Sequence, residues 1–314
     1  MSTAAPSEDE RLHRPATLRS LRLGETTVTY VPDGAAQLIP RRWLPHTTDE
    51  TWAAHPAYLD ATGNLAAGVG GLLVERGDRA LLIDTGVGPQ SLPGGPGSAH
   101  GALHGGALLD NLAALGRTPA DIEAVAFTHL HTDHIGWAGH LAPDSDRPAF
   151  AHADHLIAEP EWTHRDQLAA HGAGPEVLAP FAPYVRTVAD GEEVFPGVRT
   201  RFLLGHTPGH AGYEITGGGR RLIAFGDALH SPIQVDHPEW SAAPDHDPAL
   251  AADTRRRLVA ELREPDTIGF GIHFADVVFG QVRAGGVGPA RGPRDAWCGG
   301  PPPGRPRSRR PASG

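Results

Sequence analysis

The sequence contains no lysine, so all 27 of its basic residues are arginine. This absence excludes both a Schiff-base lysine and the lysine of a phosphate-binding P-loop. The only cysteine, Cys298, excludes a disulfide framework and a cysteine-based zinc module. No apolar run approaches the roughly 20 residues of a membrane span, and residues 1–15 are polar and charged. We therefore expect a cytoplasmic enzyme that does not act at a membrane.

Charge is distributed unevenly along the chain. The net charge of -10 argues against a nucleic-acid partner, which would be expected to face a basic surface. Residues 284–314 are instead rich in arginine, and nearly half of them are glycine or proline, a composition that cannot build a packed element. We expect a flexible segment at 1–20, one folded domain at 21–283 and a disordered tail at 284–314.

The most informative segment is the hexapeptide His129 to His134, which holds four side chains able to bind a metal: His129, His131, Asp133 and His134. It follows the apolar run 124–127. If that strand continued, residues two apart would share a face, so His129 and His131 could hold one cation. Asp133 and His134 would then face a second cation. The alternative is chance clustering in a chain with 19 histidines.

Other candidate ligands also follow short predicted strands. The pairs are 80–83 with Asp84, 200–204 with His206 and His210, 221–225 with Asp227, and 267–270 with His273. Loops at the ends of strands converge into sites in layered α/β folds.

Helices are expected between these strands. Leucines spaced three and four residues apart predict a helix over 106–115 that ends at Gly116. Asp247 and Pro248 form a good N-cap and first residue for a second helix.

The ligand motifs resemble the metallo-β-lactamase-fold hydrolases. The resemblance rests on His129-x-His131-x-Asp133-His134, Thr207-Pro208-Gly209-His210, Gly226-Asp227 and Gly271-Ile272-His273, and it runs from about Leu21 to Val282. It implies an αββα sandwich, in which two mixed β-sheets pack face to face with helices on both outer sides. Segments 41–64, with Trp43, Trp52 and Tyr58, and 145–190 would cover the substrate groove, although ordinary packing explains these aromatic residues equally well.

The resemblance also implies a ligand set. The first metal would be held by His129, His131 and His210, and the second by Asp133, His134 and His273, with Asp227 bridging both. His206 is the rival to His210, and the match to Thr-Pro-Gly-His favours His210. Nitrogen and oxygen ligands suit two zinc ions, with iron or manganese as alternatives.

The chemistry implied is hydrolysis by a hydroxide that bridges the two metals, without a covalent intermediate. Asp133 and Asp227 would serve it as ligands. Asp84 would orient an imidazole, or could be only a turn residue that caps Gly86. His230 could donate a proton to the departing group, or could have only a packing role.

The residue at position 230 bears on the branch of the family. Acyl-homoserine lactonases of the quorum-quenching type carry a tyrosine at the position of His230, so this chain looks more like the branch of methyl-parathion hydrolases and arylesterases. The expected substrate is a small-molecule aryl ester, lactone or phosphotriester. Alternatives are a thioester hydrolase or a metal-containing binding module without turnover. The resembled branch also makes a homodimer an expectation.

Overall fold

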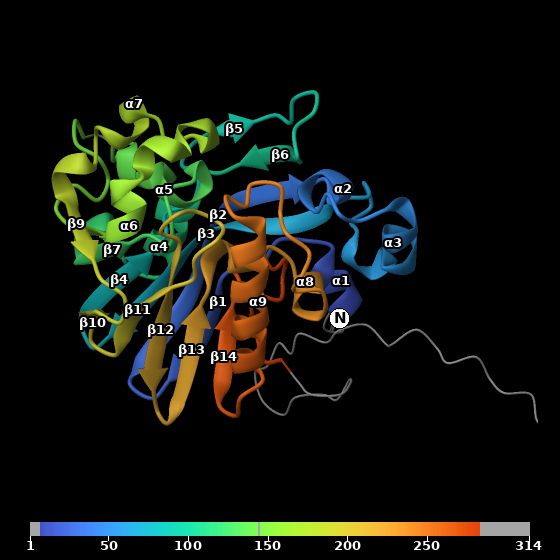
Figure 1. The fold of residues 1–314 in the computed structure, drawn as a ribbon. Helices are drawn as coiled ribbons and strands as arrows, with labels where there is room; N and C mark the ends of the chain where they lie inside the picture. The colour runs from blue at the N-terminus through green and yellow to red at the C-terminus, as the bar shows by residue number, and fades with distance from the viewer. Residues whose placement is uncertain (1–6, 144, 283–314) are drawn as a thin grey trace, which may run out of the picture.

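Two β-sheets pack face to face and carry helices on their outer sides (Figure 1). The computed structural model describes residues 7–143 and 145–282. The first sheet contains β1 (Arg19–Leu23), β2 (Thr26–Leu38), β3 (Leu65–Arg76), β4 (Arg79–Ile83), β5 (Ser91–Leu92), β6 (His100–His104), β7 (Ala124–Ala126), β8 (Asp154–Ala158) and β9 (Val185–Val188). The second contains β10 (Glu193–Phe195), β11 (Val198–Phe202), β12 (Ala211–Gly217), β13 (Arg220–Ala224), β14 (Thr267–Phe270) and β15 (Phe279–Gly280).

Both sheets are mixed. In the first sheet, the order is β5-β6-β2-β3-β4-β7-β8-β9, with β1 beside β2. The four strands β4, β7, β8 and β9 run parallel to one another. In the second, β10 to β15 follow their order in the chain, and only β13 and β14 are parallel to each other. The loops after β4, β7, β11, β13 and β14 carry the candidate site residues, and these loops meet at one edge of the sandwich.

The helices are short except one. They are α1 (Glu8–Leu12), α2 (Pro40–Trp43), α3 (Asp49–Ala54), α4 (Leu108–Ala114), α5 (Thr132–Gly139), α6 (Glu159–Thr163), α7 (Pro175–Leu178), α8 (Ile233–Asp236) and α9 (Pro248–Leu262), with 3₁₀ turns η1 (Pro56–Tyr58), η2 (Pro119–Asp121), η3 (Arg165–His171), η4 (Ala182–Tyr184) and η5 (Gly226–Ala228). The long helix α9 crosses the outer face of the second sheet, over β13 and β14 (Figure 1). Its N-cap is Asp247, as predicted. Among the described residues, no helix combines the length and hydrophobicity that crossing a membrane requires.

Alternation along the strands divides the core into layers. In β3, Leu72 lies in the core between the sheets, whereas Leu73 packs against the helices that cover the first sheet. In β13, Leu222 faces the first sheet and Ile223 packs under α9. Successive side chains point to opposite faces of a strand, so each of these sheets buries both faces. The αββα sandwich expected from the sequence is confirmed.

The covering segment 41–64 is tied into its own apolar cluster. Trp52 and Tyr58 are buried there beside Leu44, and Trp43 is partly buried against the same cluster. Ordinary packing therefore accounts for Trp52 and Tyr58, while Trp43 remains available to the site.

Asp33 joins several loops of the first sheet through its buried carboxylate. It accepts hydrogen bonds from the backbone N–H groups of Val87, Gly88, Gly106 and Leu108, at 2.9 to 3.0 Å. It also accepts the indole N–H of Trp137 at 2.8 Å. One charge thus stabilises the loop after β4, the start of α4 and the position of α5.

The expected flexible segment at 1–20 needs correction. Residues 8–12 form α1, and Arg11, Arg14 and Arg19 surround the carboxylate of Asp276, which is fully buried. A buried carboxylate has to be paired, and these arginines pair it, so this segment packs onto the domain. The tail predicted at 284–314 and residues 1–6 lie outside the described residues.

Candidate metal centre

Segments far apart in the sequence bring two groups of metal-capable side chains together. The first group comprises His129, His131, His206 and Asp227, and the second comprises Asp133, His134 and His273. Within each group the ligand atoms lie within 4.8 Å of one another. All seven except Asp133 are buried.

Asp227 lies between the two groups and presents one carboxylate oxygen to each. Its Oδ1 lies 3.2 Å from Nε2 of His134 and 3.0 Å from Nε2 of His273. Its Oδ2 lies 3.4 Å from Nε2 of His206 and 3.7 Å from Nε2 of His129. This is the arrangement that a bridging carboxylate requires.

Several of these atoms are buried without a hydrogen bond. Nε2 of His129, His131 and His134 and Oδ1 of Asp227 have no such partner among the described residues. Burying a polar atom without a partner is costly, and metal coordination would satisfy these atoms. The nitrogen and oxygen donors fit zinc, iron or manganese.

The strand predicted to carry His129 and His131 ends earlier than expected. β7 ends at Ala126, both histidines lie in the loop after it, and α5 begins at Thr132 with His131 as its N-cap residue. The backbone N–H of Thr128 donates to the carboxylate of Asp84 at 2.8 Å. This N–H is therefore not available to a neighbouring strand, and β7 does not continue. The histidines still converge, but from a loop.

Asp84 orients the imidazole of His134, as the sequence suggested. Its Oδ2 accepts the Nδ1–H of His134 at 2.9 Å, which directs Nε2 toward Asp227. The same oxygen accepts the hydroxyl of Thr128, which lies 3.0 Å from Nδ1 of His129. Burial opposes a charge on His134, but the carboxylates of Asp227, Asp133 and Asp84 outweigh it and raise the pKa of His134 well above its ordinary value.

His129 is affected in the opposite direction. Burial, reinforced by the neighbouring imidazoles of His134 and His131, holds the pKa of His129 well below its ordinary value. The ring therefore stays neutral near pH 7, which is the form of histidine that binds a metal.

The structure places His206, rather than His210, in the first group. Nδ1 of His210 donates to the carbonyl oxygen of Leu203 at 3.0 Å, and its Nε2 accepts the backbone N–H of Asp227, also at 3.0 Å. Both nitrogens of His210 are thus engaged by the protein. Burial lowers the pKa of His210 to about 3, so this ring stays neutral and holds the backbone of Asp227 in place.

Glu161 is a buried residue that sequence reasoning missed. From α6, its Oε1 accepts the N–H of Leu130 at 3.0 Å, and its Oε2 accepts the hydroxyl of Thr207 at 2.7 Å and the N–H of Gly209 at 2.9 Å. A Cβ at Gly209 would lie 1.9 Å from the backbone nitrogen of Glu161, so only glycine permits this approach. Glu161 ties the loop of His129 and His131 to the loop of His206.

His230 lies beside the centre, but it is not among the residues that line the pocket described next. Its Nε2 lies 3.3 Å from Oδ2 of Asp227, its ring packs edge-on against Trp43, and it is buried. Its contact is with Asp227, and the proton-donor role stays a prediction.

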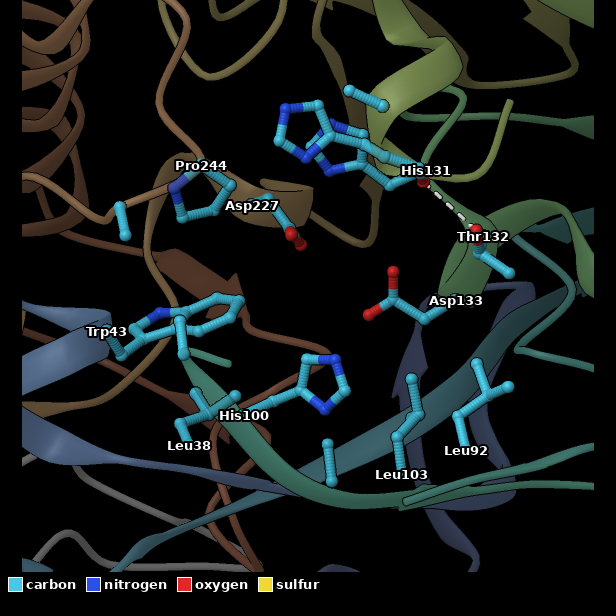
Figure 2. Close-up of a pocket in the computed structure, with 15 residues that line it drawn as sticks. Leu38, Trp43, Leu92, His100, Leu103, His131, Thr132, Asp133, Asp227 and Pro244 are labelled. Atoms are coloured by element: carbon cyan, nitrogen blue, oxygen red, sulfur yellow. Dashed lines mark hydrogen bonds between the residues drawn. The ribbon is translucent and has the colours of Figure 1, made fainter. Parts of the chain in front are cut away.

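A pocket of about 390 Å³ opens over the centre. Figure 2 shows His131, Asp133 and Asp227 along one side of it, and Trp43, Leu38, Leu92, Leu103 and His100 along the other. The polar ligands thus face a mostly apolar wall. His171 also lines this pocket, with its ring centroid 4.7 Å from that of His131.

The fold and the shared carboxylate define a class of proteins that have a candidate metal site at the edge of an αββα sandwich. The sequence profile of the metallo-beta-lactamase superfamily matches residues 71–271. The chain belongs to this superfamily.

Two curated relatives are less than 30% identical to this chain over the aligned residues. A probable metallo-hydrolase of Mycobacterium tuberculosis is 29% identical over 183 residues, which cover 52% of this chain and 58% of that protein. The match thus spans little more than half the length of that relative. An N-acyl homoserine lactonase of Bacillus thuringiensis is 26% identical over 208 residues, covering 62% of this chain and 76% of the relative.

Solved structures share the fold at lower identity. The dizinc quorum-quenching lactonase AidC, bound to a product, superposes with a TM-score of 0.74 at 21% identity, covering 86% of this chain and 95% of the other. The hydrolase AbOPH of the beta-lactamase superfamily gives 0.72 at 24% identity, covering 86% and 94%.

Proposed function

We propose that this protein is a metal-dependent hydrolase that cleaves an ester-type bond of a small molecule. The observation that carries the proposal is the pair of ligand groups sharing Asp227 at the floor of a largely apolar pocket. The metallo-hydrolase and lactonase relatives support it, since both names describe hydrolysis.

The ligands proposed for the first cation are His129, His131 and His206, and those for the second are Asp133, His134 and His273, with Asp227 bridging the two. Zinc is the proposed metal. When bound, two such cations supply an activated water molecule and polarise the oxygen of the bond to be cleaved.

The chain's own groups then bind and orient the substrate. Trp43, Leu38 and Leu103 would hold its apolar part by excluding water, which places the reacting bond toward Asp227 and Asp133 on the opposite wall. The apolar wall suits the acyl or aryl group of an ester or lactone better than a charged substrate.

The first test is metal content and turnover. The metal-depleted protein is reloaded with zinc, iron or manganese and assayed with aryl esters, lactones and phosphotriesters. We expect two bound cations and hydrolysis of at least one class. Tight metal binding without hydrolysis of any of these substrates would favour a binding module.

The second test separates the two histidines that compete for the first position. His206→Ala should lose the cation of the first group, whereas His210→Ala should keep both cations, because His210 engages Leu203 and the backbone of Asp227. The opposite result would restore the assignment made from the Thr-Pro-Gly-His motif.

A further inference from the structure

A chain of buried polar side chains lies behind His206, on the side away from Asp227. Nδ1 of His206 lies 2.9 Å from Oδ1 of Asp245, and both side chains are buried. Oδ2 of Asp245 accepts a hydrogen bond from Nη1–H of Arg255 at 3.1 Å. Arg255 also donates to the hydroxyl of Ser241 at 2.6 Å and to the carbonyl oxygen of Pro238 at 2.8 Å.

Arg255 is unusual because its side chain is completely inaccessible to solvent. It projects from α9, and the exposed fractions of the Arg255 and Asp245 side chains are both 0%. Removing two charges from water is costly, so a buried ion pair contributes little to stability by itself. The role of the Arg255–Asp245 ion pair is therefore to be found in the side chain that it orients.

The hydrogen bonds fix which atoms of Asp245 and His206 carry protons. Oδ2 of Asp245 already accepts from Arg255 and from the N–H of Ala242 at 3.0 Å. The paired carboxylate is ionised and can only accept, so Oδ1 requires a proton on Nδ1 of His206. In the neutral ring the unshared pair then belongs to Nε2. That nitrogen lies 3.2 Å from Nδ1 of His131 and 3.4 Å from Oδ2 of Asp227, inside the first ligand group.

We propose that Asp245 and Arg255 are positioning residues that hold His206 in its Nδ1–H form and so prepare Nε2 to bind a metal. The inference rests on the proposed function in that it takes His206 as a ligand of the first cation. A histidine ligand of this kind depends on the group that accepts its other N–H.

The loop that carries Asp245 also holds the surrounding backbone. The N–H groups of His246 and Asp247 donate to the carbonyl oxygens of His206 and Gly205, at 3.0 and 2.9 Å. The N–H of Ala243 donates to the carbonyl oxygen of Trp43 at 2.8 Å. The ring of His206 is therefore fixed from both its side chain and its backbone.

The substitution Asp245→Asn tests the proton placement without creating a cavity. An amide has a single acceptor oxygen, whereas Asp245 accepts on both sides. Arg255 and the N–H of Ala242 together hold that oxygen on their side, so the amide NH₂ faces Nδ1 of His206. Nδ1 must then accept, and the proton moves to Nε2, the atom needed for the metal.

The experiment is a long-range ¹H–¹⁵N correlation spectrum of metal-depleted protein with labelled histidine, recorded at pH 8.5. This pH is about two units above the ordinary pKa of histidine, so a ring with that ordinary pKa is largely neutral. The signal of His206 is identified by its absence in His206→Gln. We expect a proton on Nδ1 of His206 in the parent protein and none there in Asp245→Asn.

Asp253→Asn is the matched control, because Asp253 is an exposed acid of α9 paired only with Arg256 among the contacts described. It should leave the spectrum of His206 unchanged. A parent protein with no proton on Nδ1 of His206 would overturn the proposal, and so would an unchanged Nδ1 signal in Asp245→Asn. The parent spectrum decides the point even where the variant does not fold.

Metal affinity gives the second readout. By chelator competition, Asp245→Asn should weaken one of the two metal positions by about 10- to 100-fold, while Asp253→Asn should not. A parent protein that binds no metal would remove the proposed function. The ¹H–¹⁵N spectrum of the parent protein would then still decide whether Nδ1 of His206 carries the proton.

Discussion

Replacing Glu161 by glutamine perturbs both ligand loops without changing the volume of the side chain. The carboxylate accepts from Leu130 on one oxygen and from Thr207 and Gly209 on the other. Glutamine offers one acceptor oxygen and one NH₂ group. We expect its oxygen to face the two donors of Thr207 and Gly209, which leaves the NH₂ group opposite the N–H of Leu130.

The loss of stability follows from the number of hydrogen-bond donors that the carboxylate of Glu161 accepts. A buried N–H left without an acceptor costs about 1–3 kcal/mol, and two charge-assisted bonds that become neutral lose about 1 kcal/mol each. Against this, burial raises the pKa of Glu161 although three hydrogen bonds oppose that rise, so a neutral side chain avoids part of the desolvation cost. The net loss should be about 2 kcal/mol, or about 4–8 °C in Tm for a domain of this size.

The assay is thermal unfolding of metal-depleted protein, followed by chelator competition on the loaded protein. Glu159→Gln is the control, because Glu159 belongs to the same helix but is exposed. We expect Glu161→Gln to lower Tm and to release metal at lower chelator concentration, with Glu159→Gln unchanged. Equal Tm values for Glu161→Gln and the parent, within about 1 °C, would refute the reasoning about unmatched donors.

Three other substitutions have defined outcomes. Asp84→Asn should weaken one metal position by about 10- to 100-fold, measured by chelator competition, because it disturbs the Nδ1–H contact of His134; full retention of both metals would contradict this. Asp33→Ala should lower the free energy of unfolding, measured by urea denaturation, by about 3–5 kcal/mol, because it leaves five hydrogen-bond donors without their acceptor. A loss below about 1 kcal/mol would contradict this prediction. Trp43→Ala should raise KM for an apolar ester about 10-fold at unchanged metal content; an unchanged KM would remove Trp43 from the substrate wall.

Local patterns were sufficient to predict the strands, because alternation and turn residues are encoded in short segments. The strands β4 and β14 and the N-cap of α9 at Asp247 lie where the sequence placed them. The convergence of loops at the strand ends followed from the order of these elements. The sandwich itself was implied by resemblance to a family and is now confirmed.

Long-range contacts decided what the sequence could not. His206 and His210 follow the same strand, and which ring faces the ligand group depends on contacts with distant residues, such as those of His206 with Asp227 and with Asp245, which is 39 residues away. Glu161 gave no motif, because its partners are two backbone N–H groups and one hydroxyl. The early end of β7 likewise depends on Asp84, which is distant in the chain.

The arginines around Asp276 have a practical consequence for shortened versions of this protein. Asp276 lies three residues after His273, so a chain trimmed at residue 21 would leave an unneutralised buried carboxylate beside the loop of a proposed ligand. Removing the partners of such a charge costs about 3–5 kcal/mol. A protease that cuts after Arg19 should therefore loosen the loop between β14 and β15, although the cut lies more than 250 residues upstream of His273.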